Sequence, residues 1–176
     1  MRILPNIMWI KESVLSILAT IVILAASNIC SLAQEKLPKP IAVTVVPTQP
    51  LRFGTIALGS SGGTVSISAT GTRSATGSVI PLSLGSVYST ALFEITANPG
   101  TLISILNGPD ANMTGSNGGS ITLHLGGSFP TSPLVTTAIA PATTAITIGG
   151  TLTIGSSSAN PPGNYSGVYY ITFIQE

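Results

Sequence analysis

The fold is predicted most directly by residues 165–174, which read YSGVYYITFI. Successive side chains of a β-strand point to opposite faces, so residues two apart share a face. The odd-numbered residues from Tyr165 to Phe173 therefore share an apolar face, and Tyr170 points to the opposite one. We predict a strand over 165–174, with Tyr165 and Tyr169 in the core and Tyr170 available for a surface contact.

The same alternation recurs through the rest of the chain. Apolar residues of the Val, Ile, Leu and Phe type recur, mostly in alternation with polar ones, at residues 41–45, 51–56, 64–68, 93–95, 121–125 and 146–154, and residues 102–106 form a further short apolar run. Clusters of Gly, Pro, Asn and Ser separate these runs, and no stretch after residue 33 has a helical period. This sequence pattern predicts an all-β sandwich or barrel of antiparallel strands.

Three Gly-rich segments are predicted to be turns. Residues 98–100 (NPG) lie between two strand runs and predict a tight hairpin, and residues 60–63 (SSGG) and 116–119 (SNGG) supply positions that tolerate positive φ.

The first 33 residues predict a secretory signal peptide. Arg2 and Lys11 precede an apolar run at residues 14–26, and small residues stand before a cleavage point after Ala33. A retained membrane anchor is the alternative, and Cys30 lacks the small preceding residue of a lipoprotein signal. We therefore divide the chain into a signal peptide (1–33), an exposed tether (34–40) and one β-sandwich domain (41–176), and we expect the protein in the periplasm or at the cell surface.

Charge and residue types exclude several functions. Residues 34–176 contain four acidic and four basic side chains and no cysteine, so no basic surplus attracts nucleic acid or anionic lipid and no disulfide is available. We expect contact with a membrane only through the signal segment before cleavage. The one histidine, His124, lies between Leu123 and Leu125 and is predicted to face solvent. The chain has no cluster of metal-ligating residues and no phosphate-binding loop, so we predict no catalytic, cofactor or metal site, and no enzyme.

Six short motifs in order resemble those of one family of bacterial secreted domains, domain-of-unknown-function family 4402. They are Leu51-x-Phe53-Gly54, Gly63-Thr64-Val65-x-Ile67, Gly71-x-Arg73-Ser74-x-x-Gly77, Ala91-x-Phe93-x-Ile95-Thr96, Gly149-Gly150-Thr151-Leu152 and Gly163-x-Tyr165-Ser166-Gly167-x-Tyr169. That family is similar to the pilin-like domains of chaperone–usher fimbriae and to the spore coat protein U domain. The resemblance implies an immunoglobulin-like, pilin-like β-sandwich, export, and a structural or adhesive role at the cell envelope, with no catalytic residues.

The resemblance also suggests a mechanism of assembly by strand exchange between subunits, because an incomplete sandwich exposes an edge that another chain's strand can cover. The run with Ile41, Val43 and Val45 is the candidate donor, and its alternative is the first strand of its own sheet. Alternatively, the alternating pattern of residues 165–174 suggests that this terminal strand lies beside an open groove. Expected partners are other envelope or fimbrial proteins or a second copy. A rival function is an extracellular module that binds carbohydrate or protein through loops such as residues 107–118.

Overall fold

The computed structural model describes residues 42–45, 49–139 and 141–176. The predicted signal peptide (1–33), the tether (34–40) and Ile41 lie outside the described residues. Every described element is a β-strand, and every pairing between strands is antiparallel. The strands form two sheets that enclose apolar side chains, so the fold is an all-β antiparallel sandwich, as predicted.

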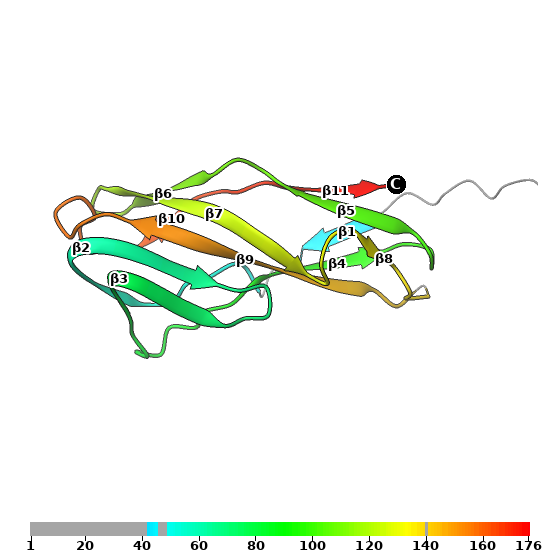
Figure 1. Ribbon diagram of the computed structural model, residues 1–176, viewed down its shortest axis with the longest axis horizontal. Helices are drawn as coiled ribbons and strands as arrows, with labels where there is room; N and C mark the ends of the chain where they lie inside the picture. Colours follow the sequence, from blue (N-terminus) through cyan, green and yellow to red (C-terminus); the bar gives the residue numbers. More distant parts are fainter. Residues whose placement is uncertain (1–41, 46–48, 140) are drawn as a thin grey trace, which may run out of the picture. The chain divides into compact units, whose positions relative to one another are not determined.

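The large sheet has eight strands (Figure 1). They are β1 (Ala42–Val45), β2 (Ile56–Ile67), β3 (Arg73–Pro81), β4 (Ala91–Thr96), β6 (Ala111–Gly115), β7 (Ser120–Phe129), β9 (Thr144–Ile154) and β10 (Tyr165–Ser166). The small sheet has three, β5 (Leu102–Asn107), β8 (Leu134–Val135) and β11 (Ile171–Gln175), in the order β11-β5-β8.

Strand β9 organises the large sheet. One of its sides pairs with β7, and the other pairs with β4 over its first half and with β2 over its second half. The change of partner occurs at Gly149. A Cβ atom there would lie within 3.0 Å of the backbone of Ile67, Ser68 and Ala69, so only glycine lets β2 pass this closely.

The buried side chains form two clusters, one along each half of β9. The first half of β9 contributes Ile146 and Ile148 to a cluster with residues of β4 and of the small sheet, including Ile103. In this cluster the rings of Phe93 and Phe173 pack with their centroids 5.2 Å apart. We call this the closed half, because a complete second sheet covers it.

The second half of β9 contributes Leu152 and Ile154 to the other cluster, with residues of β2, β3, β6 and β7. No sheet of the described residues covers this cluster. Partly buried side chains from residues 51–58 and 165–171 pack against it instead. We call this the open half.

The predicted faces of several strands are confirmed. Ile121, Leu123 and Leu125 are buried, whereas His124 between them is 71% exposed. On β2, Val65 and Ile67 are both buried, as the alternation at residues 64–68 predicts.

The single strand predicted over 165–174 is wrong. Tyr165 and Ser166 pair with β6 in the large sheet, whereas Ile171–Gln175 pairs with β5 in the small sheet, so residues 167–170 cross between the layers. At the crossing, a Cβ on Gly167 would lie 2.5 Å from the Asn112 carbonyl oxygen, which leaves room only for glycine. The alternation itself persists, because Tyr165 and Tyr169 are partly buried and Tyr170 is exposed.

Two turn predictions and one strand prediction also need correction. Residues 98–100 do turn, with Thr101 N–H donating to the Asn98 carbonyl, but the turn joins β4 and β5 of different sheets and makes no hairpin. Residues 60–63 lie within β2, where the pairing with β3 shifts register, so they form a bulge. Residues 51–55 make only an isolated bridge, between Arg52 and Ser89.

Candidate functional site

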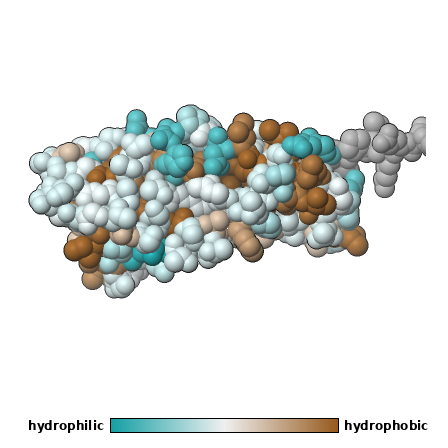
Figure 2. Space-filling view, in the orientation of Figure 1, coloured by the Kyte–Doolittle hydropathy of each residue, from teal (hydrophilic) through white to brown (hydrophobic). Residues whose placement is uncertain are grey.

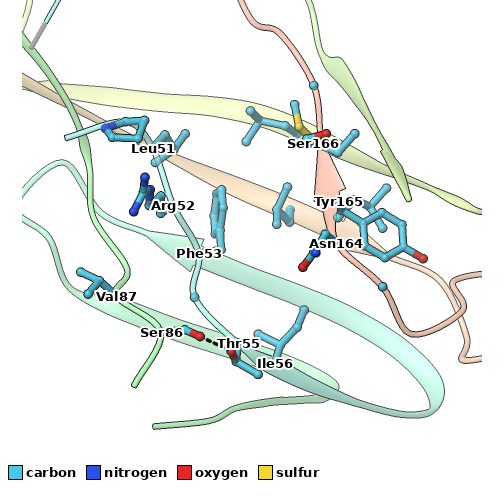
Figure 3. Close-up of a pocket in the computed structure, with 18 of the residues that line it drawn as sticks. Leu51, Arg52, Phe53, Thr55, Ile56, Ser86, Val87, Asn164, Tyr165 and Ser166 are labelled. Carbon is cyan, nitrogen blue, oxygen red and sulfur yellow. Dashed lines mark hydrogen bonds between the residues drawn. The ribbon is translucent and has the colours of Figure 1, made fainter. Parts of the chain in front are cut away.

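An open groove lies over the open half of the sandwich, with a cavity volume of about 810 Å³. One wall is formed by residues 50–56, and the other by residues 163–167 with Tyr169. The two walls face each other across the groove (Figure 3). Its floor consists of the buried residues Met113, Ile121, Leu123 and Leu152.

The first wall is tied to the rest of the protein by residues of β3 and of the segment 85–89. Arg52 and Ser89 exchange two backbone hydrogen bonds of 2.9 and 2.8 Å. Arg73 donates to the carbonyl oxygen of Phe53 (3.1 Å), and its guanidinium carbon lies 4.5 Å from the centre of the Tyr88 ring. The hydroxyl of Thr55 donates to that of Ser86 over 2.6 Å (Figure 3). These contacts hold the wall in place.

The second wall contains β10, the last strand in the path of the large sheet. Tyr165 donates its hydroxyl to the Pro161 carbonyl oxygen over 2.8 Å, as in a tyrosine corner. The Ser116 N–H donates to the Asn164 carbonyl oxygen (2.9 Å), which fixes the start of the wall. Within the described residues β10 pairs only with β6, so its other edge is free to pair with a further strand.

Tyr169, in the second wall, reaches the backbone of Leu51 in the opposite wall with its phenol. Burial raises the pKa of its phenol above the ordinary value of 10.0, and a hydrogen bond with the Leu51 backbone offsets part of that increase. Among the described residues that line the groove, none carries a carboxylate or an imidazole, and Arg52 is the only cation. The groove therefore offers apolar contact and backbone hydrogen bonds.

The structure places the predicted interaction residues in different ways. Val43 and Val45 belong to β1, which pairs with β4 in the large sheet, while Ile41 lies outside the described residues. Tyr170 is 70% exposed, as predicted, and stands just beyond the groove wall. Its role in a contact stays a prediction.

We expected an open groove beside the strand at residues 165–174, and residues 163–167 with Tyr169 do line one. The alternation did not indicate that residues 50–56 form the opposite wall. The sequence also did not predict a polar pair. Nδ1 of His124 lies 2.7 Å from Oδ1 of Asp110, and both side chains are exposed. The described part of the chain holds no group of three metal-ligating residues, and it has no helix long and apolar enough to cross a membrane.

The outward face of the large sheet carries hydroxyl groups in register. Five strands align a row of side chains, namely Thr76, Thr64, Thr153, Thr122 and Asn112. Neighbours along this face bond to one another, as between Thr64 and Thr76 (2.7 Å) and between Ser66 and Thr151 (2.8 Å). Figure 2 shows a surface mostly of intermediate hydropathy, with apolar residues emerging at separate places. Hydroxyl groups thus make up for the scarcity of charge.

Residues 43–174 match the model of the family described as Domain of unknown function (DUF4402). The chain belongs to this family. The DUF4402 match includes both walls of the groove, its floor, and β11 as far as Ile174. No curated protein and no solved structure matches the chain.

Proposed function

We propose that the protein is a secreted, non-enzymatic component of the cell envelope with a structural or adhesive role, similar to a fimbrial subunit. In this proposal the open half of the sandwich receives an extended strand from another polypeptide. The resemblance to pilin-like and spore coat protein U domains suggests this role.

The groove is the observation that carries the proposal. Its floor is apolar and the free edge of β10 forms part of one wall. A strand laid along that edge gains main-chain hydrogen bonds, and every second side chain of the strand points to the floor. Partners recognised in this way need no charge, which suits a groove whose lining has a single cation.

The residues in and around the groove favour a binding role over a catalytic one. General acid–base catalysis needs a positioned imidazole or carboxylate within reach of a substrate. His124 and Asp110 bond to each other as an exposed pair, and neither lines the groove. The residues that line the groove are better suited to binding a polypeptide than to catalysing a reaction.

The run from Ile41 to Val45 is the candidate donor, supplied by a second copy or by a related envelope protein. Ile41, Val43 and Val45 alternate with Ala42 and Thr44, as a strand entering an apolar groove requires. Because β1 pairs with β4 in its own chain, a second copy donates this run only after β1 has left β4.

A labelled peptide of residues 39–48 tests strand acceptance by fluorescence anisotropy. We expect saturable binding that is lost when Ile41, Val43 and Val45 of the peptide are all changed to Ser. The matched control peptide carries Ser at positions 42 and 44, on the opposite face, and keeps its affinity.

A pair of protein variants locates the binding. Met113→Glu places a charge on the groove floor and should abolish binding, because a carboxylate resists burial beside an apolar strand. Thr114→Glu, on the exposed face of the same strand, should bind normally. The proposal is wrong if the peptide does not bind, or if both variants bind it equally.

Export is tested separately by fractionating cells that carry a tagged chain. We expect the protein in the periplasm or at the surface, shortened at its N-terminus. Recovery of the uncleaved chain in the cytoplasm would contradict a secreted role.

A carbohydrate- or protein-binding module is the second candidate function, favoured by the hydroxyl row on the large sheet. An uncharged, hydroxyl-lined face can exchange hydrogen bonds with a neutral polysaccharide. We expect hits on a glycan array that disappear when Thr64 and Thr153 are both changed to Val. An array without hits would remove the carbohydrate form of this candidate.

A further inference from the structure

Strand β11 has a free edge among the described residues, because it pairs only with β5. Such an edge is a row of unpaired N–H and C=O groups that can template another strand. Natural proteins protect their edges with proline, charge, bulges or short length. The edges of this domain differ in how far they are protected.

Two of the other edge strands, β3 and β8, carry a protecting feature, whereas β1 and β10 are the edge strands that take part in the proposed strand donation and acceptance. Strand β3 begins at Arg73 and ends at Pro81, with a positive-φ glycine, Gly77, between them. Strand β8 has only two residues and directly follows Pro133. In contrast, β11 reads ITFIQ over five residues, without proline, charge or glycine.

The hydrogen bonds at the ends of β11 identify the groups on its free edge. The Gly108 N–H donates to the Tyr170 carbonyl oxygen (2.8 Å), and the Glu176 N–H donates to that of Leu102 (3.0 Å). In an antiparallel ladder both backbone groups of a residue point to the same side, and the sides alternate along the strand. The N–H and C=O groups of Ile171, Phe173 and Gln175 therefore point away from β5.

The side chains beside this edge are apolar and exposed. Val168, Tyr170 and Ile174 project from the outward face of the C-terminal segment, and Leu106 on β5 projects next to them. On the inward face Phe173 is only partly buried, although it packs on Phe93. Both faces of the edge thus leave apolar surface that a neighbouring strand would cover.

We propose that β11 pairs antiparallel with β11 of a second copy of this chain, joining the two small sheets into one. A two-fold axis at Phe173 opposes Ile171 with the partner's Gln175, and in this register every free-edge group meets a complementary one. The strand carries no charge, so two copies meet without repulsion between like charges. On the outward face Ile174 then lies opposite the partner's Thr172, and Tyr170 lies opposite the partner's Glu176.

This interface goes beyond the proposed strand acceptance, because no residue of β11 lines the groove. The two assemblies also differ in symmetry. Pairing about a two-fold axis closes at a dimer, whereas donation of a strand from one copy to the next is head-to-tail and continues.

Sedimentation velocity of the purified protein, from micromolar to millimolar concentration, tests the pairing. We expect a monomer–dimer equilibrium that ends at the dimer. A single species of monomer mass throughout would overturn the proposal, and so would species past the dimer that persist when Met113→Glu blocks the groove. Species past the dimer that Met113→Glu abolishes while the dimer remains would reflect strand donation added to the β11 pairing, and would support both proposals.

Variants at Gln175 test the hydrogen bonds of the edge. Gln175→Pro removes a free-edge N–H without removing a bond to β5, and the symmetry doubles the loss. We expect the dimer dissociation constant to rise about tenfold or more. Gln175→Ala keeps the N–H and should leave the constant unchanged, and equal constants for the two variants would overturn the proposed edge.

A second pair of variants tests the interface through side chains on its outward face. These variants also keep the proposal testable if Gln175→Pro does not fold. Ile174→Lys brings two like charges to diagonal positions across the two-fold axis and should also weaken the dimer about tenfold. Val135→Lys, an equally apolar and exposed site on β8 at the far side of the same sheet, should leave the dimer intact. A dimer that Val135→Lys weakens as much as Ile174→Lys would place the interface elsewhere.

Discussion

The closed and open halves of the sandwich share the strand β9 but bury its apolar face in different ways. Over the first half of β9, a three-stranded sheet covers Ile146 and Ile148. Over the second half, Leu152 lies at the floor of a groove between two separate walls. The alternation of apolar and polar residues is the same in both halves.

The difference lies in the covering layer. In the closed half the cover is hydrogen-bonded sheet, which completes the core. In the open half, residues 50–56 and 163–169 cover the core from two sides and leave room between them. In our proposal the closed half chiefly stabilises the fold, and the open half keeps a surface available for a partner.

The largest expected effect compares core truncations in the two halves. Ile103→Ala removes a fully buried side chain of the closed half and should lower the free energy of unfolding by about 2–5 kcal/mol. Met113→Ala lies on the groove floor, where the side chain borders the cavity, and should cost about 2 kcal/mol. Urea unfolding of both variants measures the difference, and a larger loss at Met113 would contradict the assignment of the two halves.

A smaller effect is expected at the boundary between the halves. Gly149→Ala forces a Cβ against the backbone of Ile67 and should cost about 1–3 kcal/mol. Gly127→Ala, on β7, meets no atom within 4 Å and is the matched control. Thermal unfolding of the two variants gives the comparison. Equal melting temperatures would mean that the close passage of β2 at Gly149 does not constrain the sheet.

The smallest effect is expected at Tyr169, which packs against both clusters. Tyr169→Phe removes its hydrogen bond to the Leu51 backbone and should cost about 1 kcal/mol at neutral pH. Because burial raises the pKa of this phenol in the folded state, its stabilising contribution is present below pH 10 and is lost as the pH rises through the higher folded pKa. Unfolding measured between pH 8 and 11 should therefore depend less on pH in Tyr169→Phe than in the wild type or in the control Tyr170→Phe.

Much of the fold is predictable from the sequence, because strand faces follow from a period of two. Burial of Leu123 beside exposed His124 needs only that alternation. The assignment of strands to sheets does not follow from it. Residues 165–174 alternate throughout, yet the chain changes sheets between Ser166 and Ile171. The change depends on contacts with β6 and β5, which are distant in sequence.

The candidate site was less predictable for the same reason. The alternation predicted Tyr165 in the core, and Tyr165 and Phe53 both pack against the core, partly buried. The groove between them exists because no described strand fills the space, and such a gap is a property of the whole topology. The exposed His124–Asp110 pair likewise depends on the register of β6 against β7.

Nuclear magnetic resonance of the isotope-labelled protein, titrated with the peptide of residues 39–48, tests the central claim most directly. We predict that chemical shift changes concentrate in residues 51–56 and 163–169 and on the floor around Leu123, while Ile103 and Ile148 stay unperturbed. Saturating changes confined to the closed half, or no change at all, would contradict a groove that accepts a strand.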